Sequence, residues 1–141
     1  MHFNKEEVIA RANAASENTL METLEIEICD VGEDFLIAKM PVNTRVHQPD
    51  GVLHGGATVA LAESVGSFAA HIFIDTDKYF VRGIEIAANH FKSIAEGTIY
   101  AKAKFIHKGR TIQHFDIKVT DDDDQLIASC KLTTITLPKS K

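Results

Sequence analysis

Residues 54–74 read HGGATVALAESVGSFAAHIFI, the most apolar stretch of the 141-residue chain. Between Ala57 and Ile74 only Glu63 carries a formal charge, so the stretch predicts a helix from about Gly55 that is buried on nearly all sides. The eighteen residues from Ala57 to Ile74 are at the short limit of a membrane span, and serine, glycine and histidine interrupt them. We therefore expect a buried helix of a globular protein.

The segments around this helix alternate apolar and polar residues, which is typical of strands with one buried face. Residues 24–29, 99–105 and 114–119 show this alternation, and residues 35–40, 79–90 and 126–137 are the other predicted strands. Asn4 and Glu7 have capping-box spacing and predict a first helix. Strands with a segregated helix predict an α+β fold, one domain over residues 1–141, in which a curved antiparallel sheet wraps around the long central helix. Any helix face left uncovered calls for a second subunit.

Composition limits the class of function. Lys and Arg number 15 against 20 Asp and Glu, for a formal net charge of −5, so nucleic acid is not an expected partner. Cys29 and Cys130 fit no zinc or CxxC spacing, and the N-terminal sequence has no apolar signal core. We expect a cytoplasmic protein with two reduced thiols, no membrane partner and no bound metal.

Gly55 and Gly56 open the predicted central helix. A helix start exposes N–H groups without intrahelical partners and carries about half a positive charge from the peptide dipoles. Glycine also lets a ligand approach the backbone closely. The pair is therefore typical of a site for a polarised carbonyl or an oxyanion, although taken alone it fits a tight packing turn better.

Glu63 is the second unusual feature, because burying an ionised carboxylate in an apolar helix is costly unless a partner compensates it. It is either exposed at a gap in the sheet or lines a cleft as nucleophile or general base. Ser67, at i+4, either orients that carboxylate or a water, or bonds back to the Glu63 carbonyl. Gln48 and His54 precede the helix, and together these residues suit attack on an acyl carbon.

Residues 47–67 fit the pattern HQPxGxLHGGAxxALAExxGS. Here the chain resembles the hotdog-fold acyl-CoA thioesterases, in the branch of the 1,4-dihydroxy-2-naphthoyl-CoA thioesterases, the enterobactin proofreading thioesterases and the Glu-dependent, PaaI-like 4-hydroxybenzoyl-CoA thioesterases. The resemblance covers nearly the whole chain. It implies hydrolysis of acyl-CoA thioesters with aromatic or bulky acyl groups, such as 1,4-dihydroxy-2-naphthoyl-CoA or hydroxybenzoyl-CoA, and no cofactor. It also implies dimers, commonly paired into homotetramers, with sites at the subunit interface.

Carried over by position, the resemblance implies that the Gly55 N–H and the Gln48 side chain polarise the thioester carbonyl. Glu63 then attacks this carbonyl or activates a water, which leaves a nucleophilic and a general-base mechanism open. Ser67 helps to position the water, and His54 supports the loop near the thioester.

The resemblance also implies substrate-binding residues. His90 matches a histidine that lines the aromatic acyl pocket from the neighbouring subunit, and Phe91 and Ser93 flank the pantetheine path. Phe68, on the pocket side of the helix, is bulkier than the family pattern implies, so the acyl preference can differ from that of the named relatives.

Lys108, Gly109 and Arg110 lie between two predicted strands and are a candidate contact for the CoA phosphates. An ordinary solvated hairpin explains each of them nearly as well. For the whole chain, the alternatives to acyl-CoA hydrolysis are a non-catalytic acyl-CoA-binding module and a thioesterase for acyl groups held by a carrier protein. A hotdog dehydratase is disfavoured, because no spaced His/Asp pair stands out.

Overall fold

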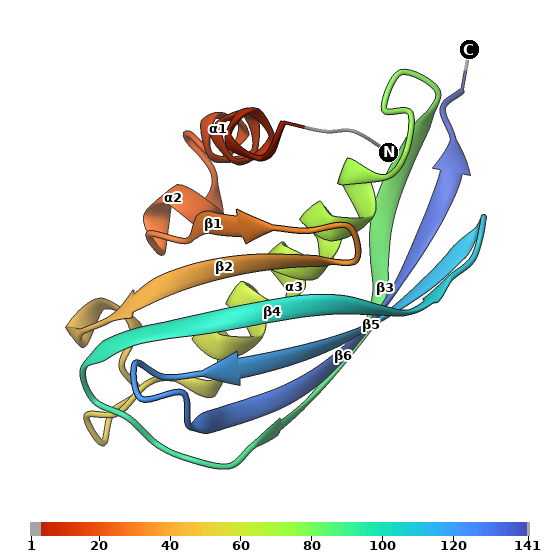
Figure 1. Cartoon of the computed structure of the whole chain (residues 1–141). Helices are drawn as coiled ribbons and strands as arrows, with labels where there is room; N and C mark the ends of the chain where they lie inside the picture. The colour runs from red at the N-terminus through yellow and green to blue at the C-terminus, as the bar shows by residue number, and fades with distance from the viewer. Residues whose placement is uncertain (1–3, 141) are drawn as a thin grey trace.

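The computed structural model describes residues 4–140, in which six strands form one curved sheet around a central helix (Figure 1). In chain order the elements are α1 (Lys5–Ala15), α2 (Leu20–Thr23), β1 (Glu27–Val31), β2 (Phe35–Val42), the 3-10 helix η1 (Thr44–Val46), α3 (Gly55–Ile72), β3 (Tyr79–His90), β4 (Gly97–Lys108), β5 (Ile112–Thr120) and β6 (Leu126–Pro138). All neighbouring strands pair antiparallel, in the order β1-β2-β4-β5-β6-β3. The predicted α+β fold, a central helix wrapped by an antiparallel sheet, is confirmed.

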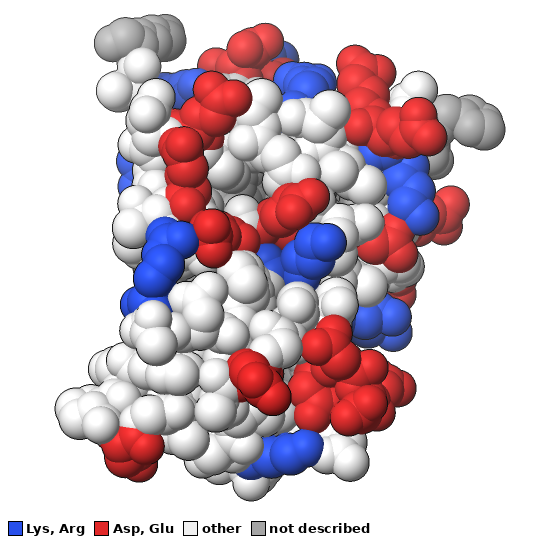
Figure 2. All heavy atoms as spheres, turned by 90° about the vertical axis from the view of Figure 1, so that its left-hand side faces the viewer, with Lys and Arg blue, Asp and Glu red and all other residues white. Residues whose placement is uncertain are grey.

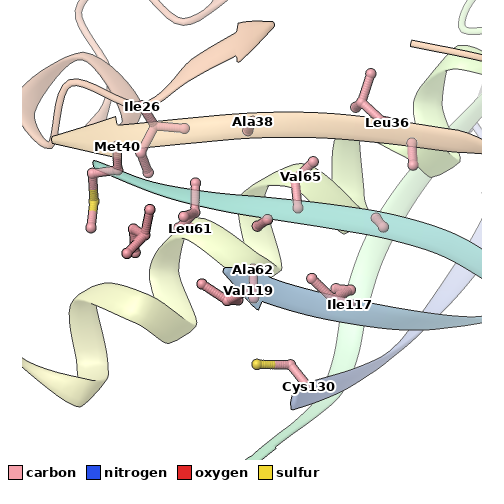
Figure 3. Packing of buried hydrophobic residues seen from close by; sticks show 14 of the residues in the cluster. Ile26, Leu36, Ala38, Met40, Leu61, Ala62, Val65, Ile117, Val119 and Cys130 are labelled. Carbon is pink, nitrogen blue, oxygen red and sulfur yellow. The ribbon is translucent and has the colours of Figure 1, made fainter. Parts of the chain in front are cut away.

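The apolar sequence of α3 is explained by its packing against the sheet (Figure 3). Leu61 and Val65 of α3 have no exposed surface, and neither has Ile117 of β5. A Cβ on Gly66 would lie 2.5 Å from the Leu132 side chain, so glycine is what lets the helix approach the sheet this closely. Within residues 4–140, no helix combines the length and the apolarity that a membrane crossing requires.

The alternating segments form strands with one buried face, as predicted. In β5, Phe115, Ile117 and Val119 are fully buried, whereas His114 and Lys118 at the alternate positions are exposed. The strand therefore points every second side chain into the core and the others away from it.

The prediction for residues 24–29 is wrong at its start. Thr19 caps the short helix α2 by accepting the Met21 N–H at 3.2 Å, and Leu24 is the residue that ends this helix. Glu25 then adopts a φ of 58°, which turns the chain before β1 begins. Local hydrogen bonding at this point overrides the apolar alternation.

β3 forms one edge of the sheet and pairs with β6 alone. Within the described residues its outer edge has no partner strand over 12 residues, and Ile84 on it is 54% exposed. Long edge strands of this kind are templates for pairing with another chain.

Charges of both signs are spread over the face of the molecule shown in Figure 2, and acidic side chains gather near one corner of it. The described residues on this face form no continuous basic patch. This distribution fits the net charge of −5 and does not favour a nucleic-acid partner on this side.

Candidate active site

His54 caps the first turn of α3 and leaves one backbone donor free. Its Nδ1 accepts the Gly56 N–H at 2.8 Å, so the ring of a neutral His54 carries its proton on Nε2. The N–H groups of Ala57 and Thr58 donate to the His54 carbonyl. Within the described residues the Gly55 N–H has no hydrogen-bond partner. It is therefore available to an oxyanion.

The imidazole of His90, at the end of β3, lies against this helix start. A Cβ on Gly55 would be 3.3 Å from Nε2 of His90, so the glycine makes room for the ring. The resemblance implies a histidine that comes from the neighbouring subunit. In the structure, His90 reaches Gly55 of its own chain, because β3 runs alongside α3.

Gln48 lies in the loop between η1 and α3. Backbone bonds hold this loop, from the Gln48 N–H to the Val52 carbonyl and from the His54 N–H to the Val46 carbonyl, both at 2.8 Å. The Gln48 side-chain nitrogen donates to the Asp50 carboxylate at 3.0 Å. A primary amide has a second N–H, so Gln48 retains one donor for a substrate carbonyl.

A cavity of about 800 Å³ opens between α1 and α3, a volume typical of small-molecule sites. Glu63, Ser67 and Phe68 of α3 line it, with Val8 and Ala12 of α1 among the residues around them. Of the two expectations for Glu63, the structure therefore has the carboxylate lining a cavity. Apolar neighbours and a carboxylate in one cavity suit an acyl substrate.

The carboxylate of Glu63 is half-buried and rests against β3. Its Oε2 would lie 3.0 Å from a Cβ on Gly83. Within residues 4–140 it accepts no hydrogen bond and forms no ion pair, and the Ser67 hydroxyl has no partner either. Ser67 thus does not bond back to the Glu63 carbonyl, and both side chains are open to a substrate or a water.

Within one chain, the Gly55 N–H and the Glu63 carboxylate, which the sequence predicts to act together, lie far apart. Glu63 follows Gly55 by eight positions on α3, about 12 Å along the axis at 1.5 Å per residue. Glu63 faces Gly83, whereas Gly55 faces His90, seven positions farther along β3. A thioester C=O bond is only about 1.2 Å long. The Gly55 N–H and the Glu63 carboxylate of one chain therefore do not converge on the same carbonyl.

The predicted phosphate contact lies in the β4–β5 hairpin, close to the opposite end of α3. The Lys108 ammonium is 4.0 Å from the ring centroid of Phe73, which ends α3, and 5.0 Å from that of Phe105. Lys108 is thus engaged in cation–π contacts. A Cβ on Gly109 would be 2.4 Å from a backbone carbonyl oxygen of the turn, so the glycine is explained by the turn. Arg110 is exposed.

Phe91 and Ser93, the predicted pantetheine contacts, follow His90 in an exposed segment. Phe91 is 60% exposed, which is unusual for a phenylalanine without a partner. Lys92, which lies between Phe91 and Ser93, forms an ion pair with Asp121 at 3.0 Å and so anchors the segment to the β5–β6 hairpin.

Neither free cysteine of the described residues is a reactive nucleophile. Burial raises the pKa of the Cys29 thiol and of the Cys130 thiol, which keeps both protonated at neutral pH. Among residues 4–140, no group of three His, Cys, Asp or Glu side chains is arranged to hold a metal ion.

Sequence reasoning missed two residues of this region. Gly83 contacts Glu63 from β3, and no sequence signal links positions twenty residues apart on different elements. Arg11 lines the cavity from α1. Its spacing from Val8 at i−3 and Ala15 at i+4 places Arg11 on the same face of that helix, which is the one signal that could have found it.

A sheet curved around a helix that starts with a free N–H and carries a half-buried carboxylate defines a hotdog-fold thioesterase. Residues 50–128 match the thioesterase superfamily, and the chain belongs to this family. It is 38% identical over 134 residues to the proofreading thioesterase EntH of Cronobacter turicensis, covering 95% of this chain and 97% of that protein.

A second relative, the 1,4-dihydroxy-2-naphthoyl-CoA hydrolase of Escherichia coli K12, is 38% identical over 137 residues, which cover 97% of this chain and 100% of that one. Among solved structures, a mutant of thioesterase PA1618 from Pseudomonas aeruginosa superimposes with a TM-score of 0.91 at 38% identity, covering 93% of this chain and 94% of that one. These relatives are named as thioesterases and hydrolases, and this chain is an enzyme of the same class.

Proposed function

We propose that the protein hydrolyses acyl-CoA thioesters whose acyl groups are aromatic or otherwise bulky, such as 1,4-dihydroxy-2-naphthoyl-CoA or a hydroxybenzoyl-CoA. The observation that carries this proposal is the Glu63 carboxylate, which has no partner among residues 4–140 and lines an apolar cavity of about 800 Å³. The hydrolase of Escherichia coli that acts on the naphthoyl ester supports this substrate class.

Glu63 supplies the reactive oxygen of the proposed reaction. In the nucleophilic form, a carboxylate oxygen bonds to the thioester carbon, the C–S bond breaks, and CoA leaves as the thiolate. Water then cleaves the mixed anhydride and regenerates the carboxylate. In the general-base form, Glu63 takes a proton from a water held by Ser67, and that water attacks the carbon. The C–S bond then breaks, CoA leaves as the thiolate, and Glu63 gives up its proton to the thiolate or to solvent. Neither form uses a metal or a cofactor.

The Gly55 N–H and the free donor of Gln48 stabilise the negative charge that develops on the carbonyl oxygen. One such donor contributes about 2.7–4 kcal/mol in studied hydrolases. Helix α3 adds the positive end of its dipole at the same place. His54 keeps this end open, because it caps Gly56 and not Gly55.

Because one chain separates Gly55 from Glu63, the proposed site is shared between two copies of the chain. An antiparallel arrangement of two α3 helices brings the glycine end of one toward the carboxylate of the other. The free edge of β3 and the exposed Ile84 provide a surface for such pairing. We therefore propose a homo-oligomer, either a dimer or a dimer of dimers.

For the CoA moiety we propose that Phe91 and Ser93 flank the pantetheine arm, with His90 beside the thioester. Arg110 is the phosphate contact of the β4–β5 hairpin, supported by Gly109, which shapes the turn. Lys108 contributes its charge to the same surface while it stacks on Phe73. We further propose a cytoplasmic location, which the unpaired Cys29 and Cys130 support.

The test is release of the CoA thiol from 4-hydroxybenzoyl-CoA and 1,4-dihydroxy-2-naphthoyl-CoA. We expect Glu63→Ala to lower kcat/KM by about 10²- to 10⁴-fold, with Glu33→Gln, an exposed acid in the β1–β2 turn, as the matched control. Unchanged turnover in Glu63→Ala would overturn the mechanism. Tight binding of both esters without thiol release would instead identify a non-catalytic acyl-CoA-binding module.

A further inference from the structure

The cavity that holds Glu63 also contains a cation that the proposed hydrolysis does not use. Among the described residues that line this cavity, Arg11 alone carries a formal positive charge and Glu63 alone a negative one. Arg11 comes from α1 and Glu63 from α3, and the two do not form an ion pair. The cavity thus has a cationic side chain besides its reactive carboxylate.

The guanidinium of Arg11 is free to bind a ligand. Within residues 4–140 no carboxylate lies within 4.0 Å of it, although Lys5 on the same helix pairs with Asp30. Arg11 shares a helix face with Val8 and Ala15, which also line the cavity. An arginine without a partner beside apolar walls is suited to a carboxylate, which it binds through two parallel hydrogen bonds.

Besides neutral hydroxyl groups, the cavity is lined by the imidazole of His71, whose free ring nitrogen is an acceptor. His71 donates from Nδ1 to the Ser67 carbonyl at 2.8 Å, so the Nε2 of the neutral ring has a lone pair and no proton. It cannot neutralise an anion without taking up a proton. Recognition of a negative charge in this cavity therefore depends on Arg11.

We propose that Arg11 is a specificity-determining residue that selects acyl groups carrying a carboxylate remote from the thioester. This inference rests on the proposed function, because it assigns the cavity to the acyl group and Glu63 to the thioester carbon. The substrate class it names is the mono-CoA thioester of a dicarboxylic acid with an aromatic or similarly bulky body. Such an acyl group fills the apolar cavity with its body and brings its free carboxylate to the guanidinium.

The experiment compares three CoA esters that differ at one position of the ring: 4-carboxybenzoyl-CoA, its neutral near-isostere 4-carbamoylbenzoyl-CoA, and benzoyl-CoA. We expect wild type to prefer the carboxylate over the carboxamide by about tenfold or more in kcat/KM, which corresponds to one charge-assisted pair. Arg11→Gln should bring this ratio close to one, and Arg11→Lys should keep part of it. Lys5→Gln, which removes a cation from the same helix outside the cavity, is the matched control and should retain the ratio.

Three outcomes would overturn the inference. They are a wild-type ratio near one, a ratio that Arg11→Gln leaves unchanged while every rate also stays unchanged, and a ratio that stays unchanged because Arg11→Gln lowers all three esters equally, which would mark Arg11 as a contact for CoA. In each case hydrolysis of benzoyl-CoA leaves the proposed function standing. Failure of wild type to hydrolyse any of the three, or the hydroxylated esters above, would overturn the proposed function and this inference with it.

Discussion

The carboxylate of Glu63 lies directly over Gly83, so that a Cβ on this glycine would be 3.0 Å from Oε2. Helix α3 carries Glu63, and Gly83 of the edge strand β3 has no side chain, which leaves room for the carboxylate. Gly83 also lies at the register shift of the β3–β6 pairing, where the strand is already irregular. A glycine on a strand leaves room for a neighbouring side chain to approach the backbone, and here that side chain is the Glu63 carboxylate.

Gly83→Ala should therefore displace the Glu63 carboxylate without disrupting the sheet. Its Cβ has ordinary contact with Leu132 at 3.6 Å, and alanine is no worse than glycine in a strand. Because a displacement of about 1 Å can cost roughly 10²-fold in rate, we expect kcat to fall by about 10- to 100-fold. The measurement is kcat together with Tm. An unchanged kcat at unchanged Tm would show that the contact does not position the acid.

Comparing Gly55→Pro with Gly55→Ala distinguishes the effect of losing the Gly55 N–H from the effect of adding side-chain volume at this position. Both add a Cβ close to His90, but only proline removes the donor. Proline is tolerated at the first position of a helix, and His54 before it has an extended conformation with ψ of 128°. We expect Gly55→Pro to lower kcat by about 10²- to 10³-fold beyond the effect of Gly55→Ala. Equal rates in the two variants would exclude the Gly55 N–H as an oxyanion donor.

Phe68→Val should widen the cavity between α1 and α3 that we propose for the acyl group. Phe68 is half-buried on α3, one position after Ser67, and lines the cavity. Removing its ring should raise the kcat/KM ratio of the naphthoyl ester to the benzoyl ester by about tenfold. Phe68→Leu, which keeps more of the volume, should give a smaller change in the same direction. A ratio that stays constant across all three proteins would place the acyl group elsewhere.

The Lys92–Asp121 contact should weaken only at a pH below the ordinary carboxyl pKa of 3.8. Hydrogen bonds from the Gln125 N–H and from Lys92 lower the pKa of Asp121 below its ordinary value of 3.8. Because the pKa is lower in the folded state, this carboxylate stabilises the hairpin above the ordinary value and loses its contribution as the pH falls through the folded pKa. NMR titration of the Asp121 side chain, with Asp121→Asn as reference, measures this. A titration midpoint at or above 3.8 would contradict the prediction.

Features that produce a local pattern could be predicted from the sequence. The alternation in β5 follows from burial on one face, and Glu63 stands out as a charge within an apolar helix. The start of β1 could not be predicted, because Glu25 takes a left-handed conformation after a short capped helix. Nor could the contact between Glu63 and Gly83, since it depends on how α3 packs against β3.

The same limit applies to the candidate site as a whole. Gly55 and Glu63 are close in the sequence and look like one unit, yet the rise of the helix sets them about 12 Å apart. Lys108, which suits a phosphate by residue type, instead lies over aromatic rings that come from other segments. In both cases the outcome depends on how far apart the side chains lie in the fold, and the residue types alone do not predict that distance.

Because Gly55 and Glu63 of one chain are too far apart to contact the same thioester, we propose that the thioester is held between Gly55 of one copy and Glu63 of the other. The most direct test is to exchange subunits between two inactive variants. Glu63→Ala and Gly55→Pro are each measured alone and then after mixing under conditions that exchange subunits. A shared site predicts that mixing restores about a quarter of the wild-type rate of CoA release, because half of the dimers are hybrids and each hybrid has one intact site of two. A mixture no more active than its components, with exchange demonstrated, would contradict the shared site.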